Sequence, residues 1–165
     1  MNTIAIRIKV QNVGTMTAEL YPEKAPITVE NFLSLIDRKF FDGLIFHRVI
    51  PGFMIQGGGY APDFSEKKTE AIKGEFAANG CRDNDIKHTR GVLSMARTMA
   101  PNSASSQFFV MHEDAPHLDG QYAAFGKVTD GFEVIDAIAN VDTGRYGYFS
   151  DVPVTPVIIE TIERV

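Results

Sequence analysis

Apolar and polar residues alternate over most of the first twenty positions of the chain. Apolar residues occupy the even positions from Ile4 to Val10 and again from Met16 to Leu20. A period of two places every second side chain on the same face of a β-strand. Asn12 and Gly14 lie between the two runs and favour a turn. We therefore predict that the chain opens with a β-hairpin.

Short apolar runs continue along the rest of the chain and are separated by pairs of turn-forming residues. The runs cover residues 44–50, 53–56, 92–96, 107–111, 123–128 and 157–162. The turn-forming pairs are Asp42-Gly43, Pro51-Gly52, Asn79-Gly80 and Asp119-Gly120. Many short strands with such punctuation are typical of a β-sandwich or a β-barrel. Residues 62–85 are the least patterned segment, and we predict that they run as a surface loop.

Two segments follow the helical period instead. Between residues 26 and 36, apolar residues recur at the i, i+3, i+4 and i+7 positions of one helical face, and Pro26 suits the first turn. We also predict a shorter helix that Asp130 caps. Its apolar side carries Val134, Ile135 and Ile138. The chain thus combines about eight strands with two helices.

Composition limits the class of protein. A chain of 165 residues with 44% hydrophobic and 22% charged residues fits one globular domain over residues 1–165. The net charge of −5 and the dispersed Lys and Arg residues argue against nucleic acid as a partner. Nothing in the pattern requires an oligomer, so we expect a monomer.

Neither the N-terminus nor any other segment indicates a membrane or secreted protein. The first ten residues alternate instead of forming a basic stretch followed by an apolar run, as a signal peptide would. No apolar run approaches the roughly 20 residues of a membrane span. Cys81 is the only cysteine, so an intrachain disulfide is impossible. We expect a cytoplasmic protein without membrane contact.

Residues 46–56 carry the most informative chemistry. Arg48 and Gln56 lie among large apolar side chains, and a glycine triplet follows at 57–59. Such a mixture can hold a ligand that is both apolar and polar, such as a proline-containing peptide. If Pro51 and Gly52 alone form the hairpin loop, strand parity places Arg48 opposite Ile55. If the loop also includes residue 53, Arg48 lies opposite Gln56, and parity alone does not choose.

Two blocks resemble the signature segments of one known family. Residues 46–56 read Phe-His-Arg-Val-Ile-Pro-Gly-Phe-Met-Ile-Gln, and residues 93–109 read Leu-Ser-Met-Ala-Arg-Thr-Met-Ala-Pro-Asn-Ser-Ala-Ser-Ser-Gln-Phe-Phe. Both are similar to the cyclophilin family of peptidyl-prolyl cis-trans isomerases. The resemblance covers nearly the whole chain, including residues 28–32 and 125–128. It implies an all-β fold, a closed eight-stranded antiparallel β-barrel with a helix at each end, and it supports the register that pairs Arg48 with Gln56.

The resemblance also implies the activity and the residues that perform it. An isomerase of this family rotates X-Pro peptide bonds in proline-containing peptides and client proteins, thereby assisting folding, and it needs no cofactor. Arg48 is similar to the catalytic arginine, which stabilises the twisted imide without a covalent intermediate. The substrate-binding residues that the resemblance implies are Phe53, Met54, Gln56, Ala96, Asn102, Gln107, Phe109, His117, Leu118 and Tyr122.

Each of these residues has an ordinary structural alternative. Phe53, Phe109 and Leu118 are also typical core residues, and Met54 could simply fill a gap. The four histidines lack the spacing of metal ligands, so we predict no metal site. Ser103, Ser105 and Ser106 lie in no Gly-x-Ser-x-Gly context, which argues against a hydrolase.

Two other functional classes compete with the enzyme. A binding module of the same fold would hold proline-containing partners with little turnover. A barrel that carries a small molecule would need an open lumen, whereas the many Phe, Ile and Val residues indicate a filled interior. The intact set around Arg48 favours the enzyme.

The chain departs from the family pattern at three places. His117 stands where many members carry a tryptophan, and the chain has no Trp at all. We therefore expect cyclosporin A to bind with reduced affinity. Tyr122 stands where some relatives have a pocket histidine. The segment 97–100 is one residue longer than the corresponding loop in eukaryotic relatives, and these features look bacterial.

Overall fold

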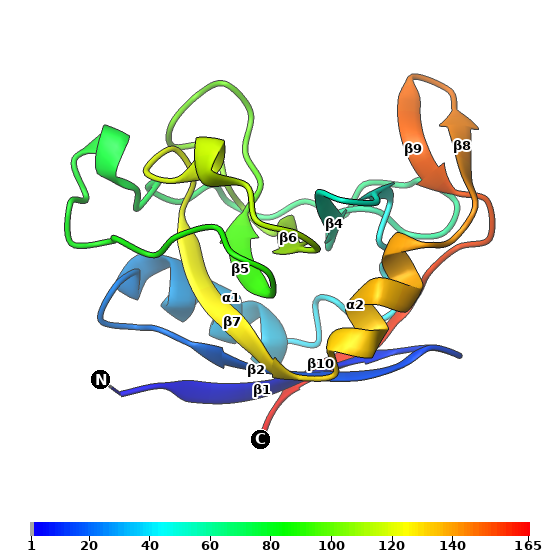
Figure 1. Ribbon diagram of the computed structural model, residues 1–165, viewed down its shortest axis with the longest axis horizontal. Helices are drawn as coiled ribbons and strands as arrows, with labels where there is room; N and C mark the ends of the chain where they lie inside the picture. The colour runs from blue at the N-terminus through cyan, green and yellow to red at the C-terminus, as the bar shows by residue number, and fades with distance from the viewer. Residues whose placement is uncertain (1) are drawn as a thin grey trace.

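A computed structural model describes residues 2–165 of the chain. Eight strands form one antiparallel sheet in the order β10-β1-β2-β7-β5-β6-β4-β3, and two more form a separate hairpin. The elements are β1 (Ile4–Val10), β2 (Gly14–Leu20), α1 (Pro26–Asp37), β3 (Arg48–Ile50), β4 (Met54–Gly57), β5 (Val92–Met95), β6 (Phe108–Met111), β7 (Ala124–Asp130), α2 (Phe132–Ala139), β8 (Thr143–Tyr146), β9 (Phe149–Pro153) and β10 (Ile159–Arg164), with single 3-10 turns at Ala77–Asn79 and Pro116–Leu118 (Figure 1).

The opening hairpin is confirmed. Strands β1 and β2 pair from Ile4 opposite Leu20 to Val10 opposite Gly14. Apart from the half-buried Ile4, the apolar residues at even positions are buried, whereas their polar neighbours reach solvent. The alternation along the chain thus corresponds to the two faces of this part of the sheet.

The eight-stranded antiparallel architecture is confirmed, but its expected closure is wrong in one detail. Within residues 2–165, the edge strands β3 and β10 form no ladder with each other. The segments that precede them meet instead at an isolated bridge between Ile45 and Ile158. The Phe46 N–H donates to the Val157 carbonyl at 2.9 Å, and the Ile159 N–H donates to the Leu44 carbonyl at 2.7 Å. Loop backbone, and not strand pairing, joins the two edges of the barrel.

Both predicted helices are present, but the predicted cap of the second is wrong. Helix α1 begins at Pro26, as expected. Strand β7 extends through Asp130, so Gly131 precedes α2 as its N-cap, with φ of 90° and no side-chain cap. A Cβ atom at Gly131 would lie 2.5 Å from the Thr15 carbonyl oxygen. The chain therefore passes from strand to helix through a left-handed turn against β2 that favours glycine.

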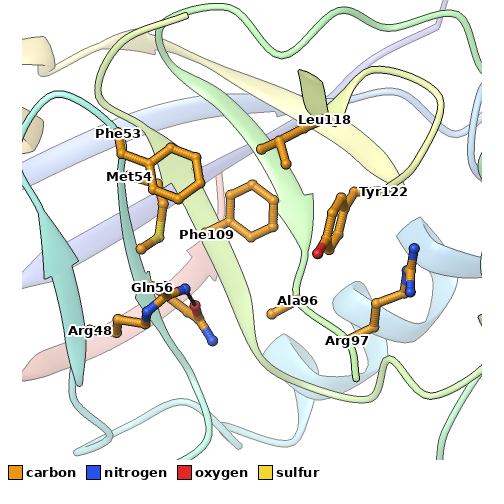
Figure 2. A pocket seen from close by; sticks show the side chains of 9 residues that line it. All are labelled: Arg48, Phe53, Met54, Gln56, Ala96, Arg97, Phe109, Leu118 and Tyr122. Carbon is orange, nitrogen blue, oxygen red and sulfur yellow. Dashed lines mark hydrogen bonds between the residues drawn. The ribbon is translucent and has the colours of Figure 1, made fainter. Parts of the chain in front are cut away.

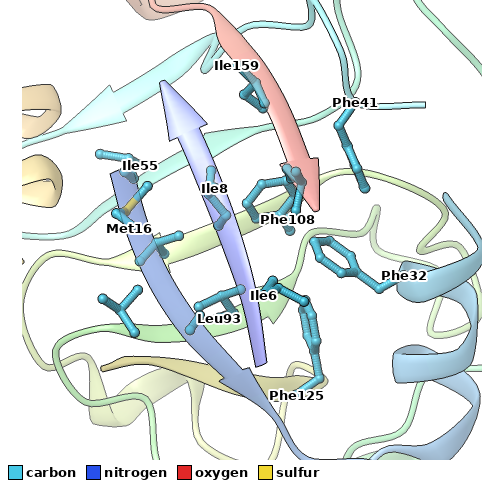
Figure 3. Packing of buried hydrophobic residues seen from close by; sticks show 14 of the residues in the cluster. Ile6, Ile8, Met16, Phe32, Phe41, Ile55, Leu93, Phe108, Phe125 and Ile159 are labelled. Atoms are coloured by element: carbon cyan, nitrogen blue, oxygen red, sulfur yellow. The ribbon is translucent and has the colours of Figure 1, made fainter. Parts of the chain in front are cut away.

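Strands β4 and β6 send alternate side chains into two different apolar clusters. Ile55, Phe108 and Val110 point into the main core, to which both helices contribute buried side chains. Figure 3 shows Ile55 and Phe108 within this cluster. Met54, Phe109 and Met111 join a second, smaller cluster on the opposite face. The other buried members of this second cluster are Val92, Ala115, Leu118 and Ala124. The period of two thus gives the same short strands a core face and an outer face.

Two segments differ from the sequence prediction. The hairpin of β8 and β9 was not predicted; Figure 1 shows it projecting at one end of the molecule. The prediction of a surface loop over residues 62–85 is wrong at its end, because Glu75, Phe76 and Asn84 are buried. The Glu75 carboxylate accepts hydrogen bonds from the backbone N–H and the hydroxyl of Thr28 in the first turn of α1. None of the helices within residues 2–165 is long and apolar enough to cross a membrane.

Candidate active site

The hairpin of β3 and β4 has the three-residue loop. Arg48 pairs with Gln56 and Ile50 pairs with Met54, which is the second of the two registers that parity left open. Gly52 takes φ of 80°, and the Phe53 N–H donates to the Ile50 carbonyl at 3.0 Å. The tight turn needs a glycine at this positive φ. It brings Arg48 and Gln56 to the same face of the hairpin.

This face opens into a cavity of about 140 Å³ on the outer side of the sheet. Its lining residues are Arg48, Phe53, Met54, Gln56, Ala96, Arg97, Phe109, Leu118 and Tyr122. Figure 2 shows Phe109 near the middle, with Arg48 and Gln56 on one side and Tyr122 and Arg97 on the other. The Tyr122 ring meets the Phe109 ring edge-on, with centroids 5.8 Å apart. The cavity therefore combines an apolar floor with a polar rim.

The floor consists of Met54, Phe109 and Leu118, which are almost fully buried. Met54 and Phe109 come from the outward positions of β4 and β6, and Leu118 comes from the 3-10 turn at 116–118. Phe53 closes one side and is only half-buried. Such a floor can take up a small apolar ring, because the ring replaces water against side chains that are already packed.

The rim is a row of hydrogen-bonded polar side chains. Arg48 Nη1 donates to Gln56 Oε1 at 3.3 Å, and Gln56 Nε2 donates to Gln107 Oε1 at 3.0 Å. Arg48 itself is exposed, so its guanidinium remains available to a ligand. An arginine keeps its positive charge at any ordinary pH and has five N–H donors. The row can therefore direct a fixed charge at a group held in the cavity.

His88 supports the floor from behind. Its ring stacks against Phe109 at 6.1 Å, its Nδ1 lies 3.1 Å from Asp119 Oδ1, and its Nε2 lies 2.9 Å from Ser94 Oγ. Burial lowers the pKa of His88, although the neighbouring Asp119 partly opposes this effect. The contacts from Ser94 to His88 and from His88 to Asp119 resemble those of a Ser-His-Asp hydrolase triad. Ser94 is 0% exposed, however, so no substrate carbonyl can reach it. The buried His88 and Ser94, together with the half-buried Asp119, support the floor of the cavity.

His47 lies next to Arg48 in the chain but on the opposite face. It is 4% exposed, and its ring packs against Tyr60 at 4.7 Å and Phe149 at 6.1 Å. Burial, followed by the charge of Arg48, lowers the pKa of His47 to about 4. Within residues 2–165, no three His, Cys, Asp or Glu side chains are grouped so that they could hold a metal ion.

Three of the predicted residues lie outside the cavity wall. Gln107 lies beside it, bonded to Gln56. His117 is exposed, with its ring stacked on Phe53 at 5.9 Å. Asn102 Oδ1 accepts hydrogen bonds from the Gly74 N–H at 3.0 Å and from Asn79 Nδ2 at 2.9 Å. The Asn102 side chain therefore holds the 74–79 segment.

Two residues at the site were not predicted from the sequence. Arg97 lines the cavity, and His88 braces its floor. Arg97 directly follows Ala96, which was predicted, but its position in a loop gives no indication of where the side chain points. His88 was considered only as a metal ligand, and its contacts come from segments more than twenty residues away or across a turn.

Comparison with known proteins identifies the family. Residues 5–164 match the family described as "Cyclophilin type peptidyl-prolyl cis-trans isomerase/CLD". The chain belongs to the cyclophilin family. It shares 49% identity over 158 residues with a peptidyl-prolyl cis-trans isomerase of Acinetobacter baylyi, a match that covers 92% of this chain and 81% of that protein. It shares 45% identity over 160 residues with peptidyl-prolyl cis-trans isomerase B of Escherichia coli, with 92% and 94% covered.

Solved cyclophilin structures agree with the fold. A cyclophilin-type isomerase of Cryptosporidium parvum superposes with a TM-score of 0.83 at 30% identity, over 99% of this chain and 98% of that chain. A second structure of that protein, obtained in the presence of the dipeptide Ala-Pro, gives a TM-score of 0.81 at 31% identity over 98% of each chain. The family match and the two bacterial relatives show that the activity of this chain is peptidyl-prolyl cis-trans isomerisation.

Proposed function

We propose that the cavity binds the proline ring of an X-Pro segment and that Arg48 lowers the barrier to rotation about its peptide bond. The proposal rests on one observation above all. An exposed arginine, held by Gln56, faces a cavity whose floor is apolar. The ring would contact Phe53, Met54, Phe109 and Leu118. Ala96 and Tyr122 would form the side walls around it. Gln56 and Gln107, with the backbone near Asn102, would position the flanking peptide.

Apolar burial accounts for binding of the ring. Removing a small ring from water is worth about 1.5–3 kcal/mol, which orients a peptide without holding it tightly. Weak binding suits an enzyme that must release its product. The Cryptosporidium parvum relative was crystallised in the presence of Ala-Pro, which supports a ligand of this class.

The charge of Arg48 accounts for catalysis. The peptide bond has partial double-bond character, and its rotation barrier is about 18–20 kcal/mol. In the twisted state the prolyl nitrogen regains its lone pair, and no covalent bond to the protein is needed. A guanidinium donor directed at that nitrogen stabilises the twisted state more than either planar isomer.

The required acceleration is within reach of such a site. Uncatalysed isomerisation takes about 10–100 s at 25 °C. Reaching milliseconds needs a factor of about 10⁴–10⁵, equivalent to about 5–7 kcal/mol. Electrostatic stabilisation by one fixed charge, together with orientation of the peptide, supplies an effect of this size. No cofactor enters the mechanism.

The wider role follows from the activity. We propose that the chain acts as a single cytoplasmic domain and monomer on X-Pro bonds of client proteins. Cyclosporin A is proposed to bind more weakly than to cyclophilins that carry a tryptophan at the position of His117, because an imidazole offers a smaller flat surface. An inhibition constant in the nanomolar range would contradict this part of the proposal.

Exchange NMR on a short peptide with one Ala-Pro bond tests the assignment. Wild type should accelerate the exchange between the cis and trans signals, and Arg48→Ala should slow it about 10²–10³-fold, the usual cost of a lost transition-state donor. Arg48→Lys keeps the charge but not the planar donor fork, and it should fall between the two. Circular dichroism must show that each variant is folded.

The outcome separates the enzyme from a binding module. If peptide signals shift on binding but exchange is not accelerated, the pocket binds proline without turnover. If Arg48→Ala retains full activity while folded, Arg48 is a docking contact and another group carries catalysis.

A further inference from the structure

Arg97 stands between two neighbouring cavities. It lines the proposed proline cavity and also a polar recess of about 220 Å³ beside it. Among residues 2–165, the only other residues that line both are Gln56 and Ala96. Figure 2 shows Arg97 at the edge opposite Arg48, beside Tyr122. The side chain of Arg97 therefore belongs to the wall that the two cavities share.

The guanidinium of Arg97 lies between two aromatic rings. Its Cζ is 4.7 Å from the centroid of Phe76 and 4.7 Å from the centroid of Tyr122. A planar cation stacks favourably on an aromatic face, and arginine does so better than lysine. Phe76 is buried in the main core, whereas Tyr122 forms part of the proline cavity. Arg97 thus connects Tyr122 in the cavity wall to a residue of the main core.

The same guanidinium also donates hydrogen bonds to the backbone of two separate segments. Nη2 donates to the Gln121 carbonyl at 2.7 Å, directly before Tyr122. Nη1 donates to the Thr98 carbonyl at 2.9 Å and the Met99 carbonyl at 3.5 Å. One side chain therefore joins the segment that carries Tyr122 to the loop that begins at Arg97 itself.

This loop has its own bracing and presents an apolar side chain at its tip. Ser103 Oγ accepts from the Thr98 N–H at 2.9 Å and donates to the Ala100 carbonyl at 2.7 Å. Met99 is 94% exposed. A flexible thioether on a braced loop is suited to contact varied peptides.

We infer that Arg97 is a positioning residue for substrate binding. It keeps the Tyr122 ring in place as a wall of the proline cavity, and it fixes the loop in which Thr98 lines the polar recess and Met99 is exposed. The inference rests on the proposed function of the cavity. Because Arg97 lies opposite Arg48, its loss changes how the peptide is held and leaves the rotation step itself nearly unchanged.

Kinetics of Arg97→Ala and Arg97→Lys test the inference. Both variants should raise KM for the Ala-Pro peptide about tenfold, with kcat within about twofold of wild type, because ring stacking and the donor fork are lost in both. NMR signals of the Tyr122 ring should shift in both variants before peptide is added. Arg145→Ala is the matched control, since Arg145 is an exposed arginine on β8 that lines neither cavity.

Three results would overturn the inference. Full recovery of KM in Arg97→Lys would mean that charge alone matters. An unchanged KM with a lower unfolding midpoint would make Arg97 a purely structural residue. A fall in kcat at constant KM would place its effect on rotation.

The failure of the proposed function can be told apart from these results. If wild type does not accelerate exchange at all, the isomerase mechanism fails, but the Kd of the peptide can still be measured by NMR titration. The inference then requires that Arg97→Lys weakens this Kd about tenfold, as expected for the loss of about 1.4 kcal/mol. An equal Kd in the two proteins would contradict it.

Discussion

Phe108 and Phe109 are neighbours in β6, both nearly buried, yet they belong to different parts of the molecule. Phe108 is 0% exposed and meets the rings of Phe32 and Phe41 in the main core (Figure 3). It also meets the ring of Phe46. Phe109 is 4% exposed and forms the floor of the cavity on the other face. Burial alone does not separate the two roles. The direction of the side chain does, and the alternation of the strand sets that direction.

Removal of the core ring should have the largest effect on stability. Phe108→Ala leaves a closed void among packed aromatic rings, and Phe→Ala changes of this kind cost about 3–5 kcal/mol. Urea unfolding should show this loss of unfolding free energy. The folded fraction should keep its peptide affinity. A loss below about 1 kcal/mol would mean that the core collapses around the gap.

A second contrast of the same kind lies in β3 and the residue before it, where His47 faces inward and Arg48 faces the cavity. Burial lowers the pKa of His47 from the ordinary 6.5 to about 4. Between these two pH values, His47 is therefore protonated in the unfolded chain but neutral in the folded protein. The contribution of His47 to the free energy of unfolding is therefore fully present above pH 6.5 and is lost as the pH drops toward 4. The loss from His47 approaches about 3 kcal/mol at its limit.

Unfolding curves at several pH values check this prediction. His47→Phe keeps an aromatic ring against Tyr60 and Phe149 but cannot titrate, so its stability should fall less between pH 6.5 and 4. Some slope should remain, because the pKa of His88 is also lowered by burial. Identical slopes in wild type and variant would exclude His47 as the source.

Removal of the floor ring should affect binding more than folding. Phe109→Ala enlarges a cavity that already opens to water, so the loss of stability should be smaller than for Phe108→Ala. Loss of the apolar contact to a bound ring should weaken peptide affinity about 10- to 100-fold, from about 1.5–3 kcal/mol. NMR titration measures the affinity and urea unfolding the stability. If both variants lose stability equally and neither loses affinity, the two faces are not functionally distinct.

Much of the fold was predictable because most strands have one face in the core. In β1 and β2 the alternation of apolar and polar residues is nearly complete, and the hairpin followed from it. All four residues of β8 are exposed, so this strand has no such pattern and was missed. The incomplete barrel closure depends on backbone contacts between residues 44–46 and 157–159, which no local pattern indicates.

The site was predictable in its residue types but less so in its geometry. The two signature blocks contain Arg48, Gln56, Met54 and Phe109, and the wider resemblance added Leu118. The structure places all five residues around one cavity. The directions of loop side chains did not follow from the sequence. The Asn102 side chain faces Gly74, whereas Arg97 reaches Phe76 and Tyr122 across a long separation in sequence. Such contacts depend on the folded positions of several segments.

The smallest effect should be that of pH on turnover. An arginine guanidinium stays protonated at any ordinary pH, and burial lowers the pKa of His47 to about 4 and that of His88 below its ordinary value. Exchange rates at saturating peptide should therefore be nearly constant over this range, in contrast to stability at lower pH. His117→Gln provides the control, because His117 stacks on Phe53 at the cavity edge. A bell-shaped profile that persists in this variant would reveal an acid or base in the rotation step.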